Sequence, residues 1–110
     1  MQYEEVANMV AAFGYPYAYR SFPQSTSKVP PYVVYYYDGY DDMYADNSNY
    51  QVIAGLRIEL YTRNKDFIAE AAVESTLRSY GIAWRKDEVY VEDEQMYLII
   101  YESEVIISGK

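Results

Sequence analysis

The stretch Gln51-Val-Ile-Ala-Gly-Leu-Arg-Ile-Glu-Leu-Tyr-Thr62 decides how the rest of this chain is placed. Apolar side chains occupy every second position from Val52 to Leu60, and Arg57, Glu59 and Tyr61 stand between or beyond them. Because alternate side chains of a strand point to opposite faces, the pattern predicts a long strand with one apolar and one polar face. It is the clearest strand in the sequence.

Two helices are predicted on either side of this strand. In residues 2–13 apolar side chains recur at three- and four-residue steps, and Gly14 ends that helix. A second helix covers roughly residues 67–80, after two candidate capping residues, Asn64 and Asp66. Its apolar stripe is narrow, which is typical of a helix that packs on a sheet with one face.

Four further strands are predicted over residues 17–22, 32–37, 82–91 and 95–107. The order is therefore α-β-β-β-α-β-β. No strand–helix–strand unit is short and regular enough to demand a parallel crossover. We therefore expect an α+β two-layer sandwich, with an antiparallel β-sheet and both helices on one face.

Length and composition set limits on function. The chain of 110 residues is expected to be a single domain over residues 1–110. It has 9 basic and 17 acidic residues, a net charge of −8, and neither histidine nor cysteine. These absences remove disulfides, Cys/His zinc sites, thiol nucleophiles and histidine acid–base chemistry. An acidic chain also repels nucleic-acid phosphates, so we expect no specific nucleic-acid binding.

The acidic residues offer two weak candidates for chemistry. Residues 38–50 contain four aspartates, but the spacing of a calcium-binding EF-hand is missing. Glu59 and Glu102 are an example of a carboxylate pair for acid–base catalysis, but such a pair needs a pocket that a small sandwich rarely has. Glycine-rich phosphate-binding motifs are also missing. We therefore expect no enzyme activity, no metal and no cofactor.

Surface recognition is the more natural use of this composition. Tyrosine accounts for 16 of the 110 residues, and a small domain cannot bury that many large rings with polar tips. Tyrosine is enriched at protein interfaces, although it is also a common strand residue. Residues 38–50 are predicted to be a long acidic loop between two strands. Its interface candidates are Tyr40, Asp41, Asp42, Tyr44 and Asp46.

No membrane segment is predicted, because the sequence has no run of 18 apolar residues. The beginning, Met1-Gln2-Tyr3-Glu4-Glu5, carries acids where a signal peptide carries bases. We therefore expect a protein made and used in a cytoplasm.

Many short motifs, in order along almost the whole chain, carry a family resemblance. They include Tyr3-Glu4-Glu5-Val6, Gly14, Pro16, Ala18-Tyr19, Phe22, Pro30-Pro31-Tyr32-Val33-Val34-Tyr35, Ala45-Asp46-Asn47, Tyr50, Ile58-Glu59-Leu60-Tyr61-Thr62, Asp66, Val73, Leu77, Glu88, Tyr90-Val91, Glu94, Tyr97 and Tyr101-Glu102. In this pattern the chain resembles the tail terminator, or tail completion, proteins. These are encoded in the tail region of long-tailed bacteriophages and prophages of Gram-positive hosts.

The resemblance implies a structural protein of the virion tail or neck, present in the host cytoplasm during assembly. Tail terminators are α+β domains that form a ring on the head-proximal end of the tail tube, and the resemblance implies that this ring is hexameric. The implied partners are other copies of the chain, the major tail tube protein and the head–tail connector. DNA passes through the lumen without specific binding. One departure is Phe67-Ile68, where a more polar first turn is expected, and these two residues are further interface candidates.

Two other readings stay open at this point. A second hypothesis is another neck component of the same virion, such as a head–tail adaptor or stopper, which would also be a small domain that assembles in a ring. An acidic protein that inhibits a basic host partner is a third reading, from a different functional class.

Overall fold

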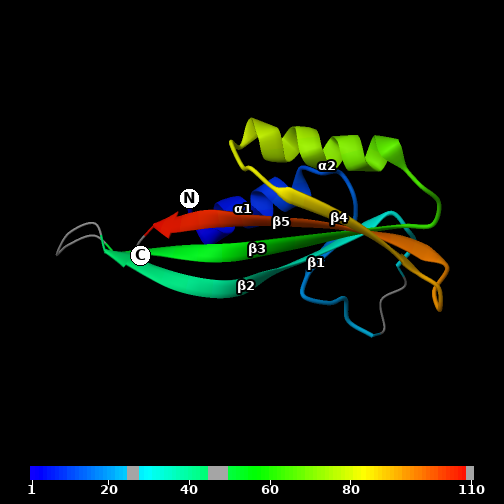
Figure 1. Cartoon of the computed structure of the whole chain (residues 1–110), viewed down its shortest axis with the longest axis horizontal. Helices are drawn as coiled ribbons and strands as arrows, with labels where there is room; N and C mark the ends of the chain where they lie inside the picture. Colours follow the sequence, from blue (N-terminus) through cyan, green and yellow to red (C-terminus); the bar gives the residue numbers. More distant parts are fainter. Residues whose placement is uncertain (25–27, 45–49, 109–110) are drawn as a thin grey trace.

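The computed structural model describes residues 1–24, 28–44 and 50–108, and it describes only the backbone at 41–44 and 50. Within these residues the predicted order of helices and strands is confirmed (Figure 1). The elements are α1 (Tyr3–Ala11), β1 (Tyr17–Tyr19), β2 (Tyr32–Tyr44), β3 (Tyr50–Thr62), α2 (Phe67–Ser79), β4 (Arg85–Val91) and β5 (Met96–Ser108).

The sheet has five strands in the order β1-β2-β3-β5-β4. Neighbouring strands are antiparallel from β2 to β4, but β1 runs parallel to β2. The sheet is therefore mixed, and the prediction of a fully antiparallel sheet is wrong at this edge. The cause is the connection of residues 20–31, which is long enough to carry the chain back before β2 begins, so that both strands start at the same end.

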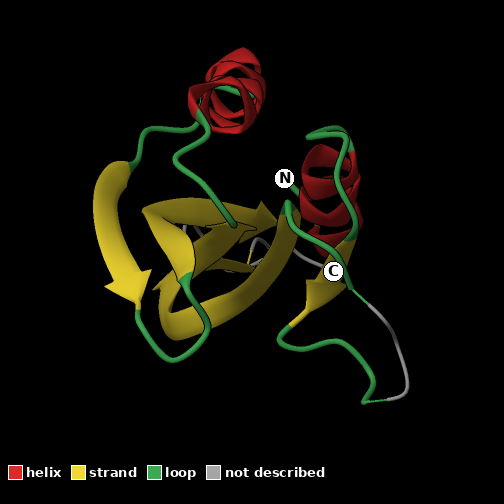
Figure 2. Ribbon diagram, turned by 90° about the vertical axis from the view of Figure 1, so that its right-hand side faces the viewer, coloured by secondary structure: helices red, strands yellow, loops and turns green. Residues whose placement is uncertain are grey.

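Both helices lie on one face of the sheet, as predicted (Figure 2). On that face β3 buries the alternating residues that the sequence singled out, Ala54, Leu56, Ile58 and Leu60. The helices and the other strands complete the core with Val6, Met9, Val10, Phe13, Val33, Tyr35, Ala69, Val73, Leu77, Ile99, Tyr101, Val105 and Ile107. We call this the helix face of the sheet, and the opposite one the open face.

Strand β2 is much longer than predicted, and this corrects the expected loop of residues 38–50. The strand continues to Tyr44, and β3 begins at Tyr50. A bulge between Tyr37 and Tyr40 lets the pairing with β3 continue past Gly39, whose φ of +94° suits glycine. The polar composition of this segment hid a strand, because bulged and exposed edge strands lack regular alternation.

The bulge also explains a glycine in the middle of β3. A Cβ atom at Gly55 would lie 2.2 Å from the carbonyl oxygen of Asp38, which no side chain can accommodate. The bulged backbone of β2 therefore lies directly against β3 at this point.

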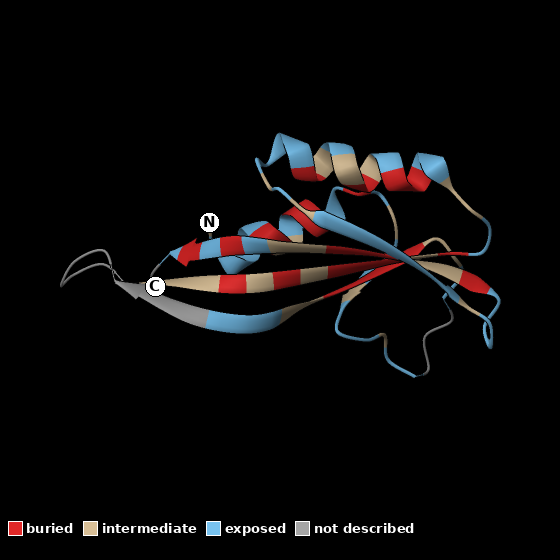
Figure 3. Ribbon diagram, in the orientation of Figure 1, coloured by how far each residue is buried: buried red, intermediate tan, exposed pale blue. Residues whose placement is uncertain are grey.

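Strand β4 forms the other edge of the sheet. It begins at Arg85 instead of the predicted Ile82, because Ile82 and Trp84 pack against the core as part of the connection from α2. Its residues are exposed from Arg85 to Tyr90 (Figure 3). It pairs with β5 through an antiparallel hairpin, as predicted for the turn at Glu92-Asp93-Glu94.

Candidate functional site

Four tyrosines form a continuous aromatic surface beside α1. The ring of Tyr37 lies 5.1 Å from that of Tyr3, 5.9 Å from that of Tyr19 and 6.1 Å from that of Tyr40. Tyr3, Tyr19 and Tyr40 are all exposed. We call these four residues the tyrosine patch. Aromatic rings that are rigid, exposed and already in contact bind a partner at low cost in side-chain entropy.

Of the residues predicted from segment 38–50, Tyr40 belongs to this patch and is 56% exposed. Asp41, Asp42 and Tyr44 lie on β2, where the structure describes the backbone alone. Asp46 lies outside the described residues altogether. The structure thus places four of the five candidates on or near one sheet edge.

Phe67 and Ile68 begin α2, and both are highly exposed large apolar residues, at 72% and 81%. The side chain of Asp66 caps the helix by accepting a hydrogen bond from the Ala69 N–H at 2.9 Å. The cap fixes the helical phase, which turns Ala69 toward the core and leaves the first two residues in solvent.

The same region approaches β4. Lys65 contacts the Phe67 ring at 4.9 Å and the Glu88 carboxylate at 2.5 Å. Tyr90 is exposed, two residues beyond Glu88 on the same face of β4. We call Phe67, Ile68 and Tyr90 the apolar patch.

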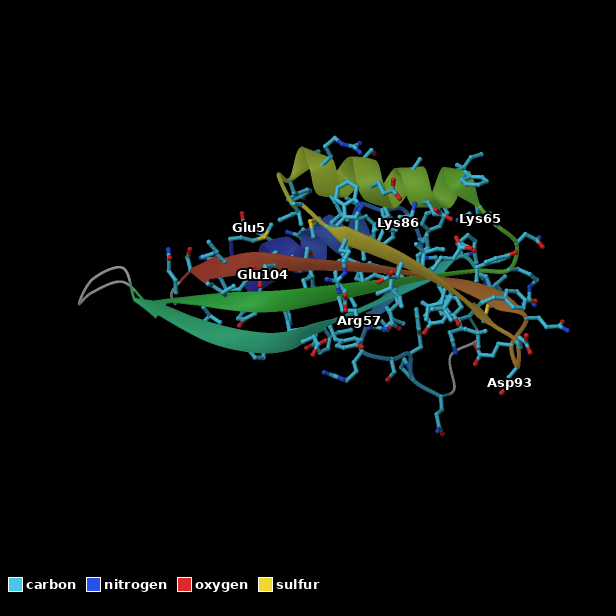
Figure 4. All side chains as sticks on the ribbon, viewed as in Figure 1. Glu5, Arg57, Lys65, Lys86, Asp93 and Glu104 are labelled. Atoms are coloured by element: carbon cyan, nitrogen blue, oxygen red, sulfur yellow. The ribbon has the colours of Figure 1, made fainter. Side chains whose placement is uncertain are left out.

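A network of charges joins α2 to β4 on the helix face, where Lys65 and Lys86 lie between the two elements (Figure 4). Glu70 is only 2% exposed, and its two oxygens meet Lys65 at 2.6 Å and Lys86 at 2.8 Å. Lys86 also meets Glu74 at 2.6 Å, and Glu74 accepts a hydrogen bond from the Tyr101 hydroxyl at 2.8 Å. We call Lys65, Glu70, Glu74, Lys86, Glu88 and Tyr101 the covered network.

The pKa values in the covered network follow from burial and pairing. Burial alone raises the pKa of Glu70, but hydrogen bonds from Lys65 and Lys86 outweigh it and hold the pKa below its usual value. The bonds to Glu70 and Glu88 raise the pKa of Lys65. Glu70 and Lys65 are therefore both charged at neutral pH, as an ion pair requires.

A second network lies on the open face. Arg57 donates to Glu59 at 2.8 Å and lies 3.6 Å from Glu102, which also pairs with Arg85. Tyr61 donates to Glu59 at 2.9 Å. We call these five residues the open network. Figure 4 shows Arg57 on the opposite side of the sheet from Lys86.

A wide cavity of about 700 Å³ borders the open network, between β3, β5 and the connection into β4. Its wall includes Arg57, Trp84, Arg85, Glu102 and Glu104. The two carboxylates considered for catalysis, Glu59 and Glu102, both bind Arg57 here. Arg57 balances the negative charge of these two carboxylates. Neither of them is therefore a free acid or base beside this cavity.

The sequence analysis missed both networks. One signal was available: Glu70 and Glu74 are four residues apart on α2, and such like charges destabilise a helix unless cations lie beside them. The pairing of the cations with β4 is a property of the tertiary structure, because Lys86 reaches Glu70 only when α2 lies across the sheet.

Among the described residues there is no group of three or more acidic side chains, histidines or cysteines arranged to hold a metal ion. No described helix is long and apolar enough to span a membrane.

Comparisons with known proteins inform the fold. No protein-family model and no curated protein matches the chain. Among solved structures, the chain is similar to a protein chain in the virion of the native gene transfer agent (GTA) particle, with a TM-score of 0.55. The identity is 15%, and the likeness covers 94% of this chain and 86% of that chain. At this identity the likeness shows a shared fold.

Proposed function

We propose that this protein is a structural component of a phage-like virion. The observation that carries the proposal is the fold shared over 94% of the chain with a protein of the GTA virion particle. The sequence resemblance to a phage tail protein family points the same way and was drawn from different information. The tyrosine patch and the apolar patch supply exposed surfaces of the kind that assembly uses.

Within the virion, we infer the role of tail terminator. Copies of the chain form a ring at the head-proximal end of the tail tube, stop tube growth and join the tail to the head connector. The contacts of the ring are head to tail, so each copy uses two different surfaces. The tyrosine patch beside β2 and the apolar patch beside β4 support this role, because they lie near opposite edges of one sheet.

The charge of the chain supports the passage of DNA through such a ring. The net charge of −8 repels phosphates at short range and prevents tight binding. A lumen lined in part by acids therefore lets DNA slide. The major tail tube protein and the head connector are the partners of this proposal.

Electron microscopy of lysates from a phage with this reading frame interrupted tests the role. Abnormally long tails, detached from DNA-filled heads, are expected if the protein terminates the tube. Normal tails beside empty or leaking heads would assign it to an adaptor or stopper of the neck. Normal infectious particles would contradict a structural role and favour an acidic inhibitor of a host protein.

A further inference from the structure

We propose that copies of this chain associate by pairing the outer edge of β4 on one copy with the outer edge of β2 on the next. The two sheets then continue into one another. This inference rests on the proposed function, since it names the contact by which the ring is built. It is tested separately below.

The outer edge of β4 is free along its length in the described chain. The strand is last in the sheet order and pairs with β5 alone, from Arg85 to Val91. Its backbone groups on the far side have no partner strand. A free edge of this kind is a template for pairing with another chain.

The outer edge of β2 is covered only at its beginning. β1 pairs with Val33–Tyr35, and the Tyr19 hydroxyl accepts a hydrogen bond from the Tyr37 N–H at 3.4 Å. From Tyr40 to Tyr44 the described strand pairs with β3 alone. Residues 36–44 contain no lysine and no proline, but the bulge and three aspartates limit indiscriminate pairing at this edge, so it favours a partner strand that carries cations.

The two edges match when the strands run antiparallel. In the register that keeps Tyr40, Glu88 and Tyr90 on one side of the sheet, Lys86 near the start of β4 lies opposite Asp42 at the acidic end of β2. In the same register Glu88 lies opposite Tyr40, and Tyr90 lies near Tyr37 across the bulge. Opposite charges and aromatic pairs across strands both stabilise a sheet.

The surfaces above the edges match in the same alignment. Both patches lie on the helix side of the sheet, since Tyr37, Tyr40 and Tyr90 share that face by register. Continuing the sheet from one copy to the next therefore brings the apolar patch against the tyrosine patch. Phe67 and Ile68 would be covered by the neighbour, which explains why two large apolar residues stand exposed at a capped helix start.

The occupant of each edge is therefore a second copy of this chain in a head-to-tail contact. A two-fold contact between two β2 edges would bring Asp38, Asp41 and Asp42 of both copies together, and like charges across strands are unfavourable. A head-to-tail contact avoids this repulsion. It also leaves one free edge of each type on every pair, so that further copies add until the ring closes.

Engineered cysteines test this contact on the purified full chain, which has no cysteine of its own. One batch carries Tyr40→Cys, and a second batch, whose chain is made longer by a removable tag, carries Glu88→Cys, the position opposite Tyr40 in this alignment; the two are mixed at high concentration and oxidised. The control mixture replaces Glu88→Cys by Ser75→Cys, an exposed position on α2. Both test positions are about half exposed, so the fold tolerates the change.

Mixed disulfides between the two batches are expected at about tenfold the level of the control, because paired strands hold the cysteines at high effective concentration. A yield equal to the control would overturn the edge pairing. A predominance of disulfides within one batch would also overturn it, in favour of a two-fold contact. The microscopy of the interrupted phage is independent: mixed disulfides with normal phage particles would reject the tail role and leave the edge pairing in place.

Discussion

The covered and open networks lie on opposite faces of the same sheet and use the same kinds of residue, but they differ in burial. In the covered network Glu70 is 2% exposed and meets two lysines. In the open network Arg85 has a side chain that is 75% exposed. A buried carboxylate that loses its partners is costly, whereas an exposed pair contributes little. Burial therefore makes Glu70 depend on its two lysines, whereas the exposed Arg85–Glu102 pair contributes little to stability.

Removal of the Glu70 carboxylate should lower the stability of the protein more than any other change to the two networks. Glu70→Ala removes the carboxylate shared by Lys65 and Lys86, which keep Glu88 and Glu74 as partners, and we expect a loss of about 2 kcal/mol in the free energy of unfolding from the lost charged hydrogen bonds. Urea denaturation at neutral pH measures it. Glu92→Ala, in the exposed β4–β5 turn, is the control and should leave the midpoint unchanged. A loss as small as that of the control would show that α2 is held by its apolar contacts alone.

Acid should weaken the covered network by protonating Glu70. The pKa of Glu70 is lowered in the folded protein, so the unfolded chain binds this proton more readily. The stabilisation is complete above the ordinary carboxylate pKa, about 4.3, and is lost as the pH falls through the lower folded value. Thermal unfolding between neutral pH and strong acid should therefore show a steeper acid loss in the natural chain than in Glu70→Gln. Parallel curves would contradict the assignment.

Removal of Arg57 tests how much the open network contributes to stability. Arg57→Ala leaves Glu59 and Glu102 without their common cation, and we expect a loss of about 1 kcal/mol, because the buried Glu59 keeps its hydrogen bond from Tyr61 and Glu102 keeps its pairing with Arg85. Arg57→Lys, which keeps the charge, should recover part of it. Chemical denaturation compares the three proteins. A loss larger than that of Glu70→Ala would reverse the order of the two networks.

The smallest effect on stability is expected for Arg85. Its ion pair with Glu102 is solvent-exposed, so Arg85→Ala should change the free energy of unfolding by no more than about 0.5 kcal/mol. The same change should lower the yield of mixed disulfides between copies, because Arg85 begins the edge of β4 that faces the acidic end of β2. Arg78→Ala, exposed on α2, is the matched control. Equal yields from both variants would contradict a role for Arg85 in the contact.

The sequence was informative where side chains alternate or recur with a regular period. The strand from Val52 to Leu60 was predicted from its alternation, and the second helix from an apolar stripe of Ala69, Val73, Leu77 and Tyr80. The first three stripe residues are buried as expected, whereas Tyr80 at the end of the helix is exposed. The exposure of Phe67 and Ile68 also followed from helical phase. These features depend on neighbours along the chain, and local pattern is enough to find them.

The features that were missed depend on contacts between distant segments. The second half of β2 is exposed and bulged, so its side chains carry no alternation to detect. The direction of β1 depends on the course of the connection before β2. The partners of Glu70 are set by the crossing of α2 over β4. None of these can be read from residues that are close in sequence.

The contact between Gly55 and the Asp38 carbonyl has a consequence for the evolution of this protein. A mutation that adds a side chain at position 55 is incompatible with the bulge, and a deletion that removes the bulge leaves Gly55 without a reason to persist. The two strands are therefore expected to change together among homologues. A relative with a larger residue at position 55 should lack the extra residue in β2, and its β2 should then be a regular strand whose pairing with β3 on either side of that position is unchanged.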